Sequence, residues 1–274
     1  MPELPEVETV VRSLAKHVTG DVIESAWFSE KPQTFKSPPA DIARVIEGAR
    51  VERIDRQGKH IVIDLRRGAG PALQKAQWIV HLGMTGQLLV RKPDAELDKH
   101  THVIAKMASG NEIRFVDPRR FGRTWVVTDE GGFEAGGHEP LDVGFEIFAG
   151  LFRGRKTPIK TALLNQKLLR GVGNIYADES LFRAQVRPRR RAASLTRDEL
   201  RRLYQAVQEV LTEAISAGGS SISDYVDADG ERGLFQIQHR VYGREGEACV
   251  VCRTPIKRVV VAGRGTHYCA KCQK

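Results

Sequence analysis

The sequence predicts an α+β multidomain fold with an N-terminal helix, an antiparallel eight-stranded β-sandwich, a helical second half and a C-terminal β-hairpin. Three observations support this expectation. Eight short β-like runs lie between residues 22 and 129, helical periodicity covers most of residues 159–217, and all four cysteines fall within residues 249–272. With 274 residues, 41% of them hydrophobic, the chain is long enough for one or two domains with proper cores.

The first expected element is an amphipathic helix over residues 3–18. Apolar residues recur there at steps of three and four, which is typical of one helix face. Pro5 is compatible with a helix only in the first turn, and Gly20 can end it. The residues of the apolar face are Leu4, Val7, Val11, Leu14 and Val18.

The β-like runs predict a sandwich that completes an N-terminal domain of residues 1–130. They are short and closely spaced, and Gly, Pro and Asn separate several of them, which is typical of antiparallel strands. A short helix is expected at residues 40–47. The eight runs are 22–29, 50–56, 60–66, 78–83, 87–92, 102–108, 112–117 and 124–129.

Residues 131–140 are expected to be a hinge linker. The stretch "DEGGFEAGGHEP" at 129–140 holds four glycines and almost no apolar residues. A helical domain is expected over residues 141–235, in which two helical runs, 159–169 and 174–184, flank the tight turn "RGVG".

A long helix is expected to follow in the same domain. Thr196 and Glu199 have the spacing of a capping box, and Gly218 with Gly219 ends the helix. The polar, turn-rich stretch 218–233 after it is expected to be a mobile loop.

The charge is distributed unevenly along the chain. Residues 1–150 hold 20 basic and 22 acidic residues, a net −2, whereas residues 151–274 hold 23 and 12, a net +11. This asymmetry favours nucleic-acid binding by the second half, with a basic solubilising surface as the alternative.

The sequence contains no run of eighteen apolar residues, so it predicts no membrane span. Acidic residues at the N-terminus argue against a secretory signal. The expectation is a soluble cytoplasmic protein.

The cysteines predict a metal site. "CVVC" and "CAKC" give the spacing C-x2-C-x16-C-x2-C, in which each pair presents two thiolates to a tetrahedral zinc ion. Two redox pairs are the alternative, but they would need a thioredoxin-like βαβ context that is missing. The ligands Cys249, Cys252, Cys269 and Cys272 leave no open position, so we expect one structural zinc in a zinc finger of residues 236–274.

Between the two cysteine pairs the sequence reads as a strand, a Gly-rich turn and a second strand. Arg264 lies in the turn between Gly263 and Gly265. Such a tip is a candidate probe into DNA, although exposed arginines usually have no special role.

Six motifs in order resemble those of bacterial formamidopyrimidine-DNA glycosylases of the Fpg/Nei family. They span the whole chain and are "PELPEVE", "RQGKH", "HLGMTG", "DPRRFG", "GVGNIYADESLF" and "VAGRGTHYCAKCQ". The resemblance implies that residues 141–235 form a helix–two-turn–helix DNA-binding domain. It also implies a bifunctional enzyme that removes 8-oxoguanine and formamidopyrimidines from duplex DNA and then cleaves the abasic site by β,δ-elimination.

The resemblance implies a nucleophile at the N-terminus. Once Met1 is removed, the imino nitrogen of Pro2 attacks the sugar, and a main-chain amine titrates far below lysine, so a useful fraction is neutral. Glu3 is implied as the proton donor to the sugar ring oxygen, and Glu6 as the holder of the amine and the helix start. Lys59 is implied as a second cation that contacts the phosphate beside the lesion. Without the other motifs, both glutamates would be ordinary first-turn carboxylates.

The resemblance also implies a set of DNA contacts. Met84, Arg119 and Phe121 fill the gap left by the everted base, although Met and Phe are usually core residues. Lys160, Asn174 and Arg264 hold phosphates, and His102 also contacts DNA. Asn174 is expected to cap its helix as well. Ser221 and Tyr225 are weaker candidates for contacts to the everted base.

Two alternatives stay open at this point. One is an endonuclease VIII-like glycosylase for oxidised pyrimidines, a sister family that starts with Gly where this chain has Leu4. The other is a non-catalytic zinc-containing protein that binds damaged DNA. The expected partner is double-stranded DNA with an oxidised purine or an abasic site. The expected state is a monomer associated with the nucleoid, without a membrane partner.

Overall fold

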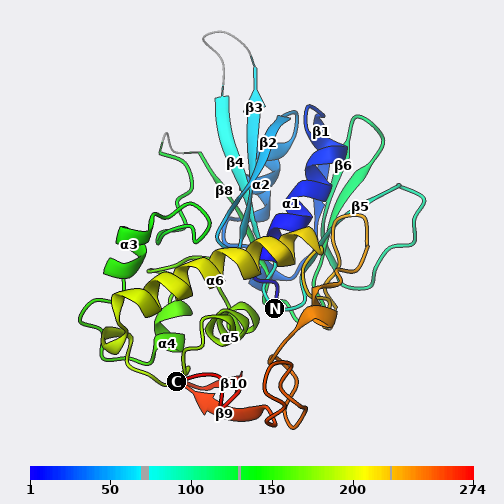
Figure 1. The fold of residues 1–274 in the computed structure, drawn as a ribbon. Helices are drawn as coiled ribbons and strands as arrows, with labels where there is room; N and C mark the ends of the chain where they lie inside the picture. The colour runs from blue at the N-terminus through cyan, green and yellow to red at the C-terminus, as the bar shows by residue number, and fades with distance from the viewer. Residues whose placement is uncertain (69–73, 129–130, 223) are drawn as a thin grey trace. The chain divides into compact units, whose positions relative to one another are not determined.

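The computed structural model describes residues 1–68, 74–128, 131–222 and 224–274 (Figure 1). Their contacts divide the chain into two compact units. The first unit comprises Met1–Ala135 and Gly218–Leu234, and the second comprises Gly136–Ala217 and Phe235–Lys274. The expected four-part division of the chain stays a prediction. Residues 129 and 130 of the expected last strand and hinge, and residue 223 of the expected loop, lie outside the described residues.

The N-terminal helix α1 spans Leu4–Val18 and confirms the predicted helix. Glu3 and Glu6 form a capping box at its start, and Pro5 lies in its first turn, where its missing N–H needs no partner. The apolar face predicted from the periodicity is buried, and the helix packs against β2, β3 and β5 of the first unit.

Within the described ranges, the first unit holds two four-stranded antiparallel sheets with the orders β1-β6-β7-β5 and β2-β3-β4-β8, which confirms the predicted sandwich. Their apolar side chains share one core with α1 and with helix α2, Pro39–Ile46. The strands are β1 Ile23–Phe28, β2 Arg50–Gln57, β3 His60–Arg67, β4 Gln74–His81, β5 Gln87–Arg91, β6 Thr101–Met107, β7 Glu112–Val116 and β8 Arg123–Val127.

Strand β4 begins four residues before the predicted run at residue 78. Its first half carries Gln74, Lys75 and Gln77, which hide the strand from a pattern based on apolar residues. Pairing with β3 specifies it instead, because residues 74–81 lie opposite residues 60–67 in an unbroken register. Tertiary context therefore overrides the local sequence signal.

The second unit is helical and ends in a hairpin. Helix α5 packs on α4, on α6 and on the hairpin strand β10, and α3 packs on α6. Short 3-10 turns lie at Ala192–Ser194 and Phe235–Gln238 in this unit, and another at Pro32–Thr34 in the first unit. The main elements are α3 Phe145–Gly150, α4 Ile159–Leu163, α5 Asn174–Arg183, α6 Arg197–Ser216, β9 Lys257–Val261 and β10 Arg264–Tyr268.

Helix α4 is shorter than the predicted run 159–169. Two polar side chains bond to the backbone just after it and compete with further helical turns. Asn165 Oδ1 accepts from the backbone N–H of Lys167 at 3.0 Å. Gln166 donates to the carbonyls of Leu164 and Val172.

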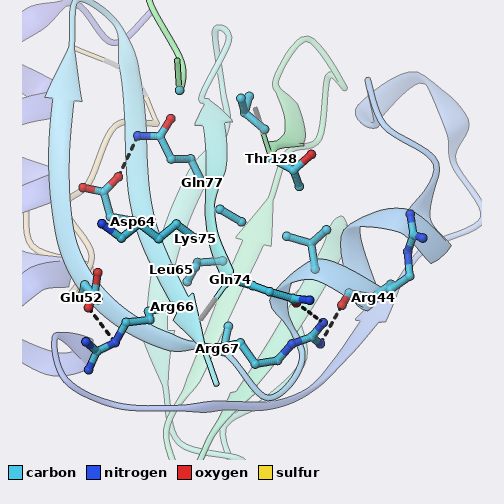
Figure 2. Close-up of a pocket in the computed structure, with 15 residues that line it drawn as sticks. Arg44, Glu52, Asp64, Leu65, Arg66, Arg67, Gln74, Lys75, Gln77 and Thr128 are labelled. Carbon is cyan, nitrogen blue, oxygen red and sulfur yellow. Dashed lines mark hydrogen bonds and ion pairs between the residues drawn. The ribbon is translucent and has the colours of Figure 1, made fainter. Parts of the chain in front are cut away.

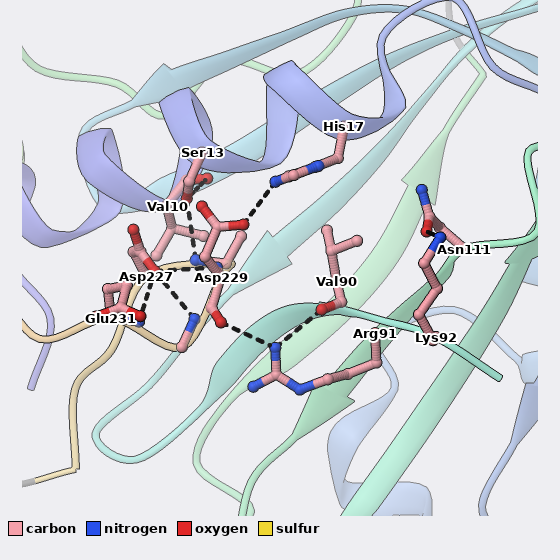
Figure 3. A network of polar contacts seen from close by, with 12 residues as sticks. Val10, Ser13, His17, Val90, Arg91, Lys92, Asn111, Asp227, Asp229 and Glu231 are labelled. Atoms are coloured by element: carbon pink, nitrogen blue, oxygen red, sulfur yellow. Dashed lines mark hydrogen bonds and ion pairs between the residues drawn. The ribbon is translucent and has the colours of Figure 1, made fainter. Parts of the chain in front are cut away.

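The segment after α6, expected to be a mobile loop, is hydrogen-bonded to the rest of the first unit, and its mobility stays a prediction. The amide of Ala228 donates to Ser13 Oγ of α1 at 3.0 Å, and its carbonyl accepts from Val90 N of β5 at 2.8 Å. Asp229 lies 2.5 Å from His17 Nε2, and Asp227 accepts from three following amides (Figure 3). The polar sequence of this segment therefore serves local backbone bonding.

Among the helices within the described ranges, none is long and apolar enough to cross a bilayer.

Candidate active site

The start of α1 gathers buried carboxylates. Pro2 is buried, and Glu3 and Glu6 are 3% and 1% exposed. Glu6 Oε2 accepts from the backbone N–H of Glu3 at 2.7 Å, and its Oε1 accepts from Ser220 N at 2.7 Å. Glu6 therefore holds both the residue beside the expected nucleophile and the segment that follows α6.

The segment 218–234 approaches Glu6 closely because of glycine. Gly219 has φ +81°, and a Cβ on it would lie 2.9 Å from Glu6 Oε1. Any side chain there would be strained and would collide with the carboxylate. The backbone conformation at position 219 and its closeness to Glu6 therefore both require a glycine there.

The candidates Ser221 and Tyr225 stabilise this segment in the structure. Ser221 Oγ donates to the carbonyl of Tyr225 at 2.8 Å and accepts from Gly233 N at 2.9 Å. The hydroxyl of Tyr225, which has one hydrogen to donate, lies 3.2 Å from the carbonyl oxygen of Glu6 and 3.1 Å from that of Gly218. Burial, with a smaller effect from Glu6, raises the pKa of Tyr225, so the phenol stays protonated and can donate.

Lys59 lies in the tight turn between β2 and β3, where Gln57 pairs with His60 and Gly58 has φ 59°. Its side chain is largely buried, at 8% exposed. Arg56 fastens this turn to α1, because its Nε lies 2.9 Å from Glu8 Oε2 and its Nη1 donates to the carbonyl of Gly58.

Arg56 was missed by the sequence analysis, although it lies in the "RQGKH" motif. Its partner Glu8 is 48 residues away in sequence. No local pattern signals such a contact, and only paired changes at both positions among relatives would have done so.

Two turns of the first unit carry the residues expected to fill the DNA gap. Met84 lies between β4 and β5 and is half-buried, whereas Phe121, between β7 and β8, is 49% exposed. The Arg119 guanidinium carbon lies 5.0 Å from the centre of the Phe121 ring. A Cβ on Gly83 would lie 2.4 Å from the nitrogen of Gly122, so the two turns touch through backbone.

His102 is buried below the second of these turns and is 4% exposed. Its Nε2 lies 2.9 Å from the carbonyl oxygen of Asp117, which can only accept, so this nitrogen carries the proton. Its Nδ1 lies 3.0 Å from Ser29 Oγ and accepts from that hydroxyl. Both ring nitrogens are thus bonded within the protein, and a DNA contact by His102 stays a prediction.

His81, at the end of β4, is held neutral. Burial, followed by the nearby His60, Lys59 and other cations, lowers its pKa to about 4. Its Nδ1 lies 3.2 Å from the backbone nitrogen of Gly83 and accepts from that N–H, which a doubly protonated ring could not do.

Lys160 of α4 does not face solvent. Its side chain is 0% exposed, and Nζ lies 2.7 Å from Asp178 Oδ1 of α5. Nζ also donates to Thr266 Oγ1 at 2.8 Å and to the carbonyl of Gly265 at 3.1 Å. A phosphate contact would have to break this arrangement, and the expected contact stays a prediction.

Asn174 does not cap its helix, contrary to expectation, because Gly173 occupies the N-cap position. Its Nδ2 donates to the carbonyl of Gly265 at 3.0 Å. Lys160 and Asn174 therefore meet at one carbonyl, directly after Arg264 in sequence. Arg264 is exposed at the start of β10, and the preceding Ala262 and Gly263 have φ 47° and 74°.

The four cysteines of the second unit form a zinc site. Their sulfur atoms all lie within 4.8 Å of one another, with Cys252–Cys269 at 3.4 Å and Cys249–Cys272 at 3.9 Å. Tetrahedral zinc with bonds of about 2.3 Å requires sulfur atoms about 3.8 Å apart, which these distances fit. The ligands pack with Phe182, Val241 and Ile256, so the zinc is structural.

A pocket on the β2-β3-β4-β8 sheet is separate from these residues (Figure 2). It is lined by charged pairs such as Glu52 with Arg66, and by Gln77, which donates to Asp64. None of the candidate residues is among its described lining residues, so this pocket is not part of the candidate active site.

Three family models match the chain. They are the formamidopyrimidine-DNA glycosylase N-terminal domain over residues 1–124, the formamidopyrimidine-DNA glycosylase H2TH domain over 137–226 and the zinc finger found in FPG and IleRS over 246–274. A formamidopyrimidine-DNA glycosylase of Solibacter usitatus is 46% identical over 275 residues, which is 100% of both chains.

Solved structures resemble the whole chain as well. The MutM (Fpg) protein of Thermus thermophilus is 41% identical with a TM-score of 0.86, over 99% of this chain and 98% of that one. The Lactococcus lactis Fpg in complex with an abasic site containing DNA is 32% identical with a TM-score of 0.89, over 99% of both.

Zinc removal is expected to disrupt the second unit alone. Chelation should abolish DNA binding, whereas tryptophan fluorescence should stay unchanged, because Trp27, Trp78 and Trp125 all lie in the first unit. Metal analysis, emission spectra and a duplex-binding assay measure this. A red shift of the emission on chelation would contradict the independence of the two units.

The pKa of His81 predicts acid sensitivity of the first unit. Unfolded histidine takes up a proton near pH 6.5, but the folded ring resists protonation down to about pH 4. The free energy of unfolding should therefore fall as the pH falls through this range, by about 2–3 kcal/mol at its lower end. His81→Gln should flatten this dependence in urea titrations followed by tryptophan fluorescence, with His100→Gln as the exposed control. Equal slopes for wild type and His81→Gln would contradict the assignment.

Proposed function

Because the chain belongs to the formamidopyrimidine-DNA glycosylase family, we propose that it removes oxidised purines from duplex DNA and cleaves the resulting abasic site. Its relatives carry the name of this activity. Structures similar to it hold DNA with Fapy-dG, carbocyclic 8-oxo-G or an abasic site. The observation that carries the proposal is the buried start of α1, where Glu6 fixes Glu3 beside Pro2.

The first step forms a covalent bond between enzyme and sugar. The free imino nitrogen of Pro2 attacks C1′, and the bond from C1′ to the damaged base breaks with the electron pair going to the base. The nitrogen loses its proton, and the departing base takes up one proton. Glu3 gives a proton to the ring oxygen as the ring opens, which leaves an iminium ion on Pro2. The role of Glu6 is to hold the Glu3 backbone, through the bond to its N–H.

The second step breaks the strand. The iminium draws electrons from the sugar, so the C2′ proton becomes acidic and leaves, and the 3′-phosphate departs with the C3′–O electron pair. A second elimination releases the 5′-phosphate, and water then frees Pro2. Lys59, in its turn fixed by Arg56, is the cation proposed to face the phosphate beside the lesion.

DNA must be opened before this chemistry. Base eversion costs a few kcal/mol, and side chains that enter the stack offset part of that cost. Met84 and Phe121 are proposed as wedges, and Arg119 as the partner of the unpaired cytosine. Because DNA is the substrate, we also propose that the protein acts in the cytoplasm on nucleoid DNA.

Oxidised pyrimidines are a second candidate substrate class. A structure similar to this chain, the wild-type Lactococcus lactis Fpg, holds an oxidised pyrimidine containing DNA. Parallel excision assays with 8-oxoguanine and thymine glycol duplexes separate the two classes, and faster purine excision is expected.

The covalent step has a direct test. Protein lacking Met1 should be trapped on 8-oxoguanine duplex by borohydride, with the adduct on Pro2 in peptide mass spectrometry. Glu3→Gln should bind this duplex but lose at least about 100-fold in excision, the usual range for a general acid. Glu24→Gln, at an exposed position of β1, is the control. No adduct with correctly processed wild type would favour a non-catalytic DNA-binding protein.

The salt dependence of binding separates Arg264 from Lys160. Loss of one phosphate contact should lower the slope of log K against log salt by about 0.9, and this is expected for Arg264→Ala. Lys160→Met leaves the Asp178 charge buried without its partner, so it should destabilise the second unit by about 3–5 kcal/mol yet keep the wild-type slope. Calorimetry and binding titrations measure both. A reduced slope for Lys160→Met would show a direct phosphate contact.

A further inference from the structure

Asp117 connects the two turns that carry the gap-filling residues. Its side chain is 0% exposed and follows β7 directly. Oδ1 accepts from Thr85 Oγ1 at 2.6 Å and from Arg119 N at 3.2 Å, and Oδ2 accepts from Gly122 N at 2.7 Å. The carboxylate thus binds Thr85 of the Met84 turn and both ends of the Arg119–Phe121 turn.

The bond from Thr85 is not part of ordinary turn geometry. An aspartate commonly accepts from the amide two residues further on, as Asp117 does from Arg119 N. Thr85 is 32 residues away in sequence and belongs to the connection between β4 and β5. Its hydroxyl therefore joins the two turns through a side chain, in addition to their backbone contact.

Hydrogen bonds hold both the carbonyl and the amide of Asp117 in place. Its carbonyl accepts from His102 Nε2 at 2.9 Å, and its amide donates to the carbonyl of His100 at 3.0 Å. A Cβ on Gly122 would lie 2.5 Å from Phe115 Cζ, so the turn lies directly on the core. The carboxylate is therefore held rigidly enough to position what bonds to it.

We propose that Asp117 and Thr85 are positioning residues that assemble Met84, Arg119 and Phe121 into one rigid insertion unit before DNA is bound. Two independent turns would each have to be ordered in the DNA, at an entropic cost to insertion. One charge-assisted hydrogen bond joins them already in the free protein. The inference rests on the proposed function and explains how the two turns are ordered for base eversion before DNA is bound.

Removal of the link should affect eversion more than chemistry. A duplex that already contains an abasic site has no damaged base to evert, whereas an 8-oxoguanine duplex must be opened. Thr85→Val keeps the shape of the side chain but removes the donor, so it should slow single-turnover excision of 8-oxoguanine about tenfold, the factor expected for one such bond. Borohydride trapping at a preformed abasic site should change less than about twofold.

Two further variants identify the hydroxyl as the cause. Thr85→Ser keeps the donor and should restore excision to near the wild-type rate. Asp117→Ala removes the acceptor and should also lose excision of 8-oxoguanine more than trapping at the abasic site. Thr19→Val makes the same change at an exposed position of the first unit and is the control. Thermal unfolding followed by tryptophan fluorescence checks that each variant is folded.

Each of the following results would contradict a specific part of the proposal. Normal excision by Thr85→Val would show that the link has no role. Equal losses on both duplexes would mean general damage to the site, and failure of Thr85→Ser to restore excision would assign the effect to packing of the methyl group. If wild type itself neither excised nor formed an adduct, the proposed function would fail, whatever the variants do.

Discussion

Hydrogen bonds to the buried Glu6 carboxylate join two distant segments of the first unit. One oxygen accepts from Glu3 N at the start of α1, and the other accepts from Ser220 N, which lies 214 residues after Glu6. A buried carboxylate without such partners would be costly, so the two segments and the charge stabilise one another. The close approach of Gly219 and the hydroxyl of Tyr225 complete the same arrangement. Glu6 therefore holds the backbone beside Pro2 in place.

Local sequence patterns predict much of the fold. The helix at the N-terminus, the sandwich strands and the zinc cysteines follow from periodicity and spacing, because these signals lie within a few residues or repeat along the chain. The start of β4 and the end of α4 do not follow from them. In the first case pairing with β3 decides, and in the second the side chains of Asn165 and Gln166 bond to the backbone.

In the candidate site, too, local motifs predict some features, whereas contacts between distant residues determine others. Motifs single out Pro2, Glu3 and Lys59, but the contacts that fix these residues join positions far apart in sequence, as Arg56 does with Glu8. Lys160 and Asn174 show the reverse case. Their motifs suggested phosphate contacts, and the structure has both side chains donating to the carbonyl of Gly265. Asp117 likewise bonds to residues next to the expected DNA contacts, because it accepts from Thr85 beside Met84 and from Gly122 beside Phe121. These motif residues thus hold the backbone of neighbouring motif residues in place.

The assignment of Gly218–Leu234 to the first unit has a consequence for any dissection of the protein. The chain leaves the first unit after Ala135, returns at Gly218 and leaves again after Leu234. A fragment cut at the hinge would lack the amide that satisfies one Glu6 oxygen and the amide that bonds to Ser13. The first unit is therefore discontinuous in the sequence, and a fragment that contains all of it must restore residues 218–234 by circular permutation or fusion.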